Sequence, residues 1–325
     1  MGAITTSSKV FGWIRQGKSL QSIGLILIIV VQCLIFSFLH PAFFSALNFF
    51  NILTQMVSLS ILAMGVTFVL VCGGIDLSMG SIMSITSVIT AMALVATESI
   101  PIAIVVGILT GIAFGVVNGY FVAYRRIQPF AVTLGTMSVA AGLALVISNG
   151  TTVRGLPQSF AFIGRGQLFG VPAQVYILLV VFILCYLLLH KMPFGTLCFS
   201  VGGNLKAAEL SGVSARSVKM RSFIISGGLA AVAAIIATSR TGSGFPNMGA
   251  GAINMQALAA AVIGGASLGG GRGAVASTIM GALFITILNN GANLVRVSPH
   301  VQDVMIGGII IASAWIDHYR RKRMG

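Results

Sequence analysis

The chain has 325 residues, of which 57% are hydrophobic and only 7% are charged, and its mean hydropathy is +1.02. Because soluble domains carry roughly 25% charged residues, this composition excludes a soluble protein and predicts an all-α, polytopic membrane protein surrounded by lipid. The net charge of +14 comes from 19 Lys and Arg against 5 acids, and these cations stand between apolar segments, which indicates membrane topology and not nucleic-acid binding.

The first 22 residues precede the first apolar run and are basic. Within them, residues 12–19 (GWIRQGKS) fit the nucleotide-binding pattern G-x-x-x-x-G-K-[ST]. That motif works only between a strand and a helix of a nucleotide-binding domain, which a segment of this length cannot form. We interpret residues 1–22 as a cytoplasmic tail. No small-residue cleavage site follows the apolar run, so we expect it to remain as the first membrane helix.

Charges, prolines and glycine clusters divide the rest of the chain into about ten apolar segments suited to a hydrocarbon core about 30 Å thick. The predicted membrane helices cover residues 23–40, 52–72, 79–97, 101–124, 129–149, 173–190, 222–239, 255–268, 274–293 and 301–317. The Gly-rich joints at 73–80 and 264–273 predict breaks within the membrane. Such breaks are tolerated where protein or a water-filled cavity satisfies the backbone, as in a transport pathway.

The positions of the cations predict the orientation of these helices. Alternating them from a cytoplasmic N-terminus leaves outside only four of the 19 Lys and Arg residues, namely Arg154, Arg165, Arg240 and Arg296. This bias predicts that both terminal tails, 1–22 and 318–325, lie in the cytoplasm. The long inner connection at 191–221 is the most charged stretch outside the C-terminal tail, and we expect it to form a docking surface.

Asp76 is the only acid lodged between two apolar spans without basic neighbours. A charge at the centre of a membrane helix costs about 2.5–3.5 kcal/mol on insertion scales, so such a residue supports a broken backbone or serves a pathway. We expect Asp76 mainly to accept hydrogen bonds from N–H groups at the start of the helix that Gly80 opens. Direct substrate contact and ion coupling are the alternatives, and Ser78 is a second candidate pathway residue.

Four asparagines are further candidate pathway residues. Asn118 lies beside a stripe of four glycines, one every fourth residue over 107–119, whose spacing predicts close helix packing. Asn118 could therefore face a partner helix or a pathway. Asn289, Asn290 and Asn293 lie on nearly one face at the end of a later span, where they could bind sugar hydroxyls or join helices.

Patterns typical of enzymes and metal sites are missing. The four cysteines have neither metal-site nor disulfide-framework spacing, and we expect no metal site. No H-E-x-x-H, paired-carboxylate or G-x-S-x-G pattern occurs, so the sequence predicts no catalytic residues.

Four sequence motifs follow one another along the chain: 73–80 (GGIDLSMG), 129–137 (PFAVTLGTM), 202–213 (GGNLKAAELSGV) and 263–273 (IGGASLGGGRG). In order and spacing they resemble those of the membrane subunits of ribose-type ABC importers, which carry monosaccharides and related small polyols. The resemblance runs from about Asn51 to Trp315. It implies that residues 1–325 form a single transmembrane permease domain in a bacterial inner membrane.

The resemblance also implies partners. Such permeases work as a pair, made of two copies or two paralogues, with a cytoplasmic ABC ATPase and a periplasmic sugar-binding protein. The permease itself would be no enzyme and would hold no cofactor, because the partner ATPase binds ATP and Mg. The motif that begins with Gly-Gly-Asn implies the segment that couples to the ATPase. The residues expected to couple are Gly202, Gly203, Asn204, Lys206, Glu209, Ser211 and Gly212. Here Asn204 is placed to cap a short helix over 205–210, which Gly212 would end.

This chain departs from the family pattern at two places. Asn254 and Gln256 stand where a Glu-x-Asp pair is common, and Ala141 stands where an Arg is often found. The departures imply an altered substrate or a partner permease that supplies the charges. The alternative function is an ion-coupled secondary transporter of small polar solutes, which needs ion-coupling acids on broken helices, and only Asp76 is available.

Overall fold

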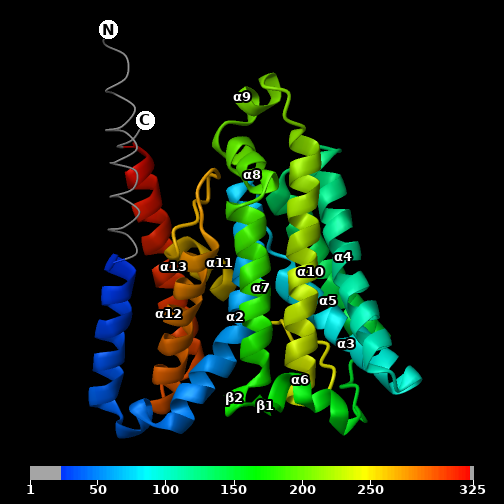
Figure 1. Cartoon of the computed structure of the whole chain (residues 1–325), viewed down its shortest axis with the longest axis vertical. Helices are drawn as coiled ribbons and strands as arrows, with labels where there is room; N and C mark the ends of the chain where they lie inside the picture. Colours follow the sequence, from blue (N-terminus) through cyan, green and yellow to red (C-terminus); the bar gives the residue numbers. More distant parts are fainter. Residues whose placement is uncertain (1–22, 323–325) are drawn as a thin grey trace.

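The computed structural model describes residues 23–322, and most of them are helical (Figure 1). The predictions for residues 1–22, including the motif at 12–19, and for residues 323–325 lie outside the described part. The main helices are Ile23–Leu39, α2 (Ala46–Val71), α3 (Met79–Thr97), α4 (Ile100–Ala123), α5 (Pro129–Ile147), α7 (Ala173–His190), α8 (Pro193–Gly203), α10 (Ala215–Thr241), α11 (Ile253–Ile263), α12 (Val275–Leu294) and α13 (Pro299–Lys322).

Seven of the described helices are long and apolar enough to cross a membrane: α2, α3, α4, α5, α7, α10 and α12. The helix Ile23–Leu39, α11 and α13 occupy the three other predicted spans, so the all-α, polytopic prediction is confirmed with ten as an approximate number. Two predicted helix starts were wrong. α2 begins at Ala46 because the Ser45 hydroxyl caps it, and α10 begins at Ala215, earlier than the expected 222. Long basic side chains in the first turns of α10 can reach water, so charge did not mark the true helix start.

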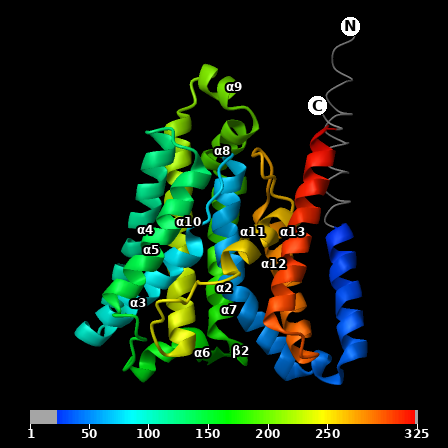
Figure 2. The same cartoon turned by 180° about the vertical axis from the view of Figure 1, so that it is seen from behind.

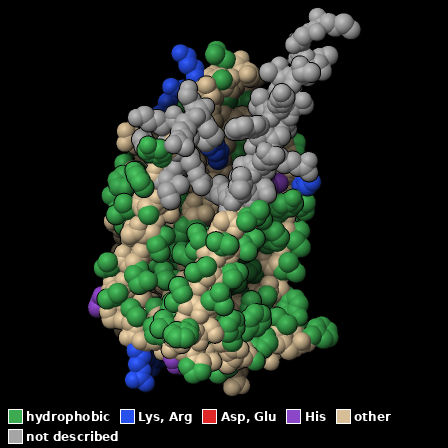
Figure 3. All heavy atoms as spheres, turned by 90° about the vertical axis from the view of Figure 1, so that its left-hand side faces the viewer, with side chains coloured by type: hydrophobic (Ala, Val, Ile, Leu, Met, Phe, Trp, Pro, Cys, Tyr) green, Lys and Arg blue, Asp and Glu red, His purple; other side chains and the backbone are tan. Residues whose placement is uncertain are grey.

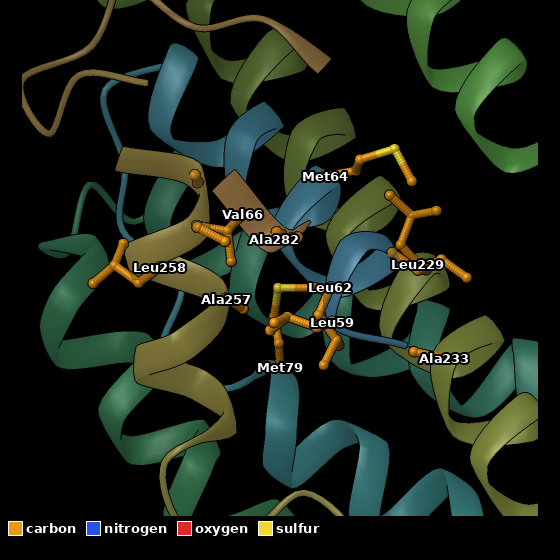
Figure 4. Close-up of a cluster of buried hydrophobic side chains, with 14 of the residues drawn as sticks. Leu59, Leu62, Met64, Val66, Met79, Leu229, Ala233, Ala257, Leu258 and Ala282 are labelled. Carbon is orange, nitrogen blue, oxygen red and sulfur yellow. The ribbon is translucent and has the colours of Figure 1, made fainter. Parts of the chain in front are cut away.

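The helices are layered from the centre to the lipid. Within the apolar windows of α2 and α10, 78% and 72% of residues are buried, against 22% in α4 and 17% in α5. A cluster of apolar side chains from α2, α3, α10, α11 and α12 fills the centre (Figure 4). Hydrophobic side chains also cover much of the outer surface in the view of Figure 3. A protein that is apolar both inside and outside fits a bilayer, whose tails are themselves apolar.

The glycine stripe on α4 packs against α10. A Cβ added at Gly111 would overlap the carbonyl oxygen of Gly227, and one added at Gly115 would lie 2.5 Å from the carbonyl oxygen of Phe223. The two backbones therefore contact each other directly, and the predicted packing role of the stripe is confirmed.

Two helices begin inside the bundle. After α2 ends, residues 72–78 turn back into the interior, so that Met79 at the start of α3 is buried against Gly65. After α10, residues 242–252 run along α3, where the Phe245 and Gly249 N–H groups donate to serine hydroxyls of α3, and α11 follows. The break predicted at 73–80 is confirmed, and the predicted span 255–268 is the short helix α11 followed by a loop.

The two ends of the bundle differ. At one end lie α8, the short helix α9 (Leu205–Leu210) and the end of α13 (Figures 1 and 2). The other end carries η1 (Pro41–Phe44), η2 (Gln158–Ala161), α6 (Phe162–Arg165) and a hairpin of β1 (Gln167–Leu168) and β2 (Val171–Pro172). The predicted inner connection 191–221 is thus not a loop but α8, α9 and the start of α10.

Candidate functional site

The helix α9 forms as its sequence predicts. The Asn204 Oδ1 accepts a hydrogen bond from the Ala207 N–H at 3.0 Å, and Gly212 follows the helix with a φ of 82°. Lys206, Glu209 and Ser211 are exposed, and Leu210 is 83% exposed. A capped helix with a free apolar side chain and free charges is a surface suited to a protein partner.

The residues before α9 join this surface to the interior. A Cβ added at Gly202 would overlap the carbonyl oxygen of Val71, the last residue of α2, which also accepts a hydrogen bond from the Gly271 N–H at 2.9 Å. A Cβ added at Gly270 would lie 2.5 Å from the Gly202 oxygen and 2.9 Å from the Gly73 Cα. We call Gly73, Gly202, Gly270 and Gly271 the glycine junction. Here the motif 202–213 touches both Gly-rich breaks, so the end of α8 packs directly against them.

Asp76 lies at the centre of a buried hydrogen-bond network. Its Oδ1 accepts from the Ser78 N–H at 2.9 Å and from the Ser78 hydroxyl at 2.6 Å, and its Oδ2 accepts from the Ser226 hydroxyl at 2.7 Å. The Asn118 amide donates to the Ser78 hydroxyl at 2.9 Å and accepts from the Thr136 hydroxyl at 2.6 Å. The network therefore ties residues 72–78 to α4, α5 and α10.

The prediction that Asp76 accepts the hydrogen bonds at the start of α3 was wrong. The Gly80 N–H donates to the Oδ1 of Asn254, at the start of α11, and Asp76 bonds only to the residue before the helix and to α10. Asn254 is one of the departures from the family pattern. Because a carboxylate oxygen accepts the same bond, asparagine at this position removes a charge while keeping the contact between the two broken helices.

The three asparagines of α12 have three different surroundings. Asn290 is buried and donates to the Asn48 Oδ1 at 3.0 Å, which joins α12 to α2. Asn293 is exposed and accepts from the Gln302 amide at 2.8 Å, which joins α12 to α13. Asn289 lines a cavity. The helix face that they share did not predict these different environments, because the contacts of each side chain depend on the neighbouring helices.

A cavity of about 210 Å³ lies among α2, α3, α10, α11 and α12. Its polar lining comes from Gln55, Ser58, Arg240, Gln256, Thr286 and Asn289. Of these six residues, only Asn289 was a pathway candidate in the sequence analysis. In the pairs Gln55/Ser58 and Thr286/Asn289 the two polar residues are three apart on an apolar helix. This spacing places both on one helix face and could have predicted a polar cavity. Within residues 23–322, no three metal-ligating side chains cluster.

Comparison with known proteins identifies the family. The family described as "Branched-chain amino acid transport system / permease component" matches residues 48–314. The chain is 38% identical to the ribose import permease protein of Bacillus subtilis (strain 168) over 300 residues, 92% of this chain and 93% of that protein. It is 34% identical to the D-allose transport system permease protein of Escherichia coli (strain K12) over 296 residues, 90% of each.

The xylose transport system permease protein of Haemophilus influenzae is 32% identical over 364 aligned positions, which cover 93% of this chain and 97% of that protein. No solved structure matches the chain. These matches span nearly the whole chain and nearly the whole of each relative, and they confirm the resemblance that the four motifs indicate. The chain belongs to the ribose-type family of ABC importer permeases, as a membrane-spanning transport subunit whose ATP is hydrolysed by a partner protein.

Proposed function

We propose that this subunit forms the membrane pathway for a monosaccharide and that α8 and α9 dock on a cytoplasmic ABC ATPase. The names of its relatives, which refer to ribose, allose and xylose, support the substrate class. The chemistry of the cavity supports it too. Among the described residues, those that line the cavity include one cation and no carboxylate, whereas an amino-acid substrate requires partners for both of its charges.

The orientation is part of the proposal. The end that carries α8, α9 and the end of α13 is the cytoplasmic one, and both chain termini lie there in a bacterial inner membrane. The charge distribution supports this, because it leaves only Arg154, Arg165, Arg240 and Arg296 at the outer end. A periplasmic sugar-binding protein then delivers substrate to the outer end, and a second permease, identical or paralogous, completes the transporter.

The contacts at the glycine junction support the proposed coupling to the ATPase. The exposed helix α9 follows directly on Gly202 and Gly203, and Gly202 touches the end of α2 and the loop before α12. Movement imposed on α8 and α9 by an ATPase is therefore transmitted to the breaks that precede α3 and follow α11. ATP and Mg are bound by that partner. The candidate coupling residues Lys206, Glu209 and Ser211 belong to the exposed docking surface.

Charge reversal at Glu209 tests this coupling. Glu209→Lys places a like charge three residues from Lys206 on the docking surface, and Asn204→Ala weakens α9 by about 0.5–2 kcal/mol. We expect both variants to lower co-purification of the ATPase and ATP-driven uptake together, Glu209→Lys more strongly. Glu98→Lys, the same change at the exposed C-cap of α3, is the matched control and should leave ATPase association unchanged.

Wild-type ATPase association and uptake in Glu209→Lys, or after deletion of residues 205–210, would show that α9 is not the coupling element. The turn at Arg125 and Arg126 would then be the next candidate.

A further inference from the structure

The cavity among α2, α3, α10, α11 and α12 reaches Arg240, near the end of the bundle that carries α6. Arg240 lies in the last turn of α10 at that end, where its backbone oxygen accepts from the Arg165 Nε at 2.6 Å. Gln256 lies in the first turns of α11, which begins inside the bundle. The cavity therefore extends from the proposed outer end toward the level at which the two broken helices meet.

Two residues that line the cavity each have a buried polar atom without a hydrogen-bond partner in the protein. These atoms are the Ser58 hydroxyl and the Asn289 Oδ1. Ser58 is only 5% exposed. A buried polar group without a partner is destabilising, so a site of this kind is stabilised by a guest that supplies hydrogen bonds. One hydroxyl and one carbonyl oxygen together can bind a guest that both donates and accepts.

The other residues that line the cavity indicate which class of molecule it can bind. Leu59, Met83 and Met248 give the cavity an apolar part, and two glutamines give it further amide donors and acceptors. The guanidinium of Arg240 is held at the wall by a hydrogen bond from its Nη1 to the Thr54 oxygen at 3.4 Å. Amides and hydroxyls beside apolar side chains suit a ring that has hydroxyl edges and C–H faces. The lining disfavours a cation, because none of its described residues is an acid.

We propose that this cavity is a binding site for one uncharged, hydroxyl-rich molecule of monosaccharide size, and that the site lies within a single subunit. At about 210 Å³ the cavity is smaller than the roughly 300–1,000 Å³ typical of sites for drug-sized ligands, which suits one sugar ring and excludes larger glycans. The assignment rests on the proposed function, since it names where the transported sugar is held. Asn289 and Ser58 bind hydroxyls, and Arg240 and Gln256 orient the ring.

Two serines of α2 provide the test. Ser58 and Ser60 both have buried hydroxyls without a partner, but only Ser58 lines the cavity. Since neither hydroxyl has a bond in the protein to lose, a purely structural role predicts the same small effect for Ser58→Ala and Ser60→Ala. We expect Ser58→Ala to lower the initial rate of ATP-driven uptake threefold or more, with Ser60→Ala within 1.5-fold of wild type. Asn289→Leu, which removes the carbonyl oxygen and adds apolar bulk beside the cavity, should lower the rate at least tenfold.

The rates are measured in proteoliposomes that contain the whole importer, with D-ribose, D-allose and D-xylose as the probes. Labelling gives a second readout: in a background without the native cysteines, Asn289→Cys should react with an impermeant methanethiosulfonate, and the transported sugar should slow that reaction. Equal rates for Ser58→Ala and Ser60→Ala, with no protection of Asn289→Cys, would overturn the cavity assignment alone. If the wild-type importer carried none of the three sugars, the proposed function and this assignment would fail together.

Discussion

Gly202→Ala is expected to abolish ATP-driven uptake in a membrane-inserted protein. The added methyl group would overlap the carbonyl oxygen of Val71, which already accepts a hydrogen bond from the Gly271 N–H. Both neighbours are backbone atoms of other segments, so no side-chain rotation relieves the overlap. Forced overpacking costs about 1–3 kcal/mol, and here α8 must separate from the end of α2. Separation disconnects the docking surface from both breaks.

Gly203→Ala is the matched control, because a Cβ at Gly203 has no atom within 4 Å. We expect this variant to keep most of the wild-type uptake. The measurement is the uptake rate per assembled importer, together with ATP hydrolysis stimulated by the loaded binding protein. Equal uptake by Gly202→Ala and Gly203→Ala would contradict transmission through the glycine junction.

Asp76→Ala is expected to destabilise the subunit strongly. It leaves the Ser78 N–H and the hydroxyls of Ser78 and Ser226 without their acceptor, at a cost of about 1–3 kcal/mol for each buried group. Asp76→Asn should be much milder, since its oxygen still accepts from Ser78 and its amide donates to the Ser226 hydroxyl. The measurement is the thermal midpoint of the solubilised protein and the amount of inserted protein. Wild-type stability in Asp76→Ala combined with lost uptake would instead assign Asp76 to substrate contact or ion coupling.

Features encoded by neighbouring residues were predictable from the sequence. The short helix over 205–210, its Asn204 cap and its end at Gly212 are all local, and the structure confirms each. The glycine stripe on α4 is also local, since its period places it on one helix face. Partners that lie far apart in the chain were not predictable. Asn254 accepts a hydrogen bond from the Gly80 N–H, although 174 residues separate the two in the chain, and no spacing rule connects them.

The cavity was missed for a related reason. Its walls come from five helices and the segment between α10 and α11, and each contributes only one to three residues. A polar residue on an apolar helix predicts a partner, but the sequence does not say whether that partner is protein or substrate. Asn290 and Asn289 are adjacent, yet one joins α12 to α2 and the other lines the cavity.

The alternative of ion-coupled transport has little support in the described residues. Asp76 is the acid available for coupling, and its two oxygens are occupied by three neutral donors. Asp76 also does not line the cavity. A coupling acid needs access to the ion and the substrate site, and this carboxylate is instead part of the packing of α4, α5 and α10.

Reconstitution tests the central claim most directly. Purified wild-type chain is placed in liposomes either alone or with its ABC ATPase, its partner permease if the pair is heteromeric, and the sugar-binding protein, and uptake of labelled D-ribose, D-allose and D-xylose is measured. We predict that uptake of at least one sugar requires the complete importer and ATP, and that the chain alone accumulates none under a proton or sodium gradient. Gradient-driven accumulation by the chain alone would contradict the account.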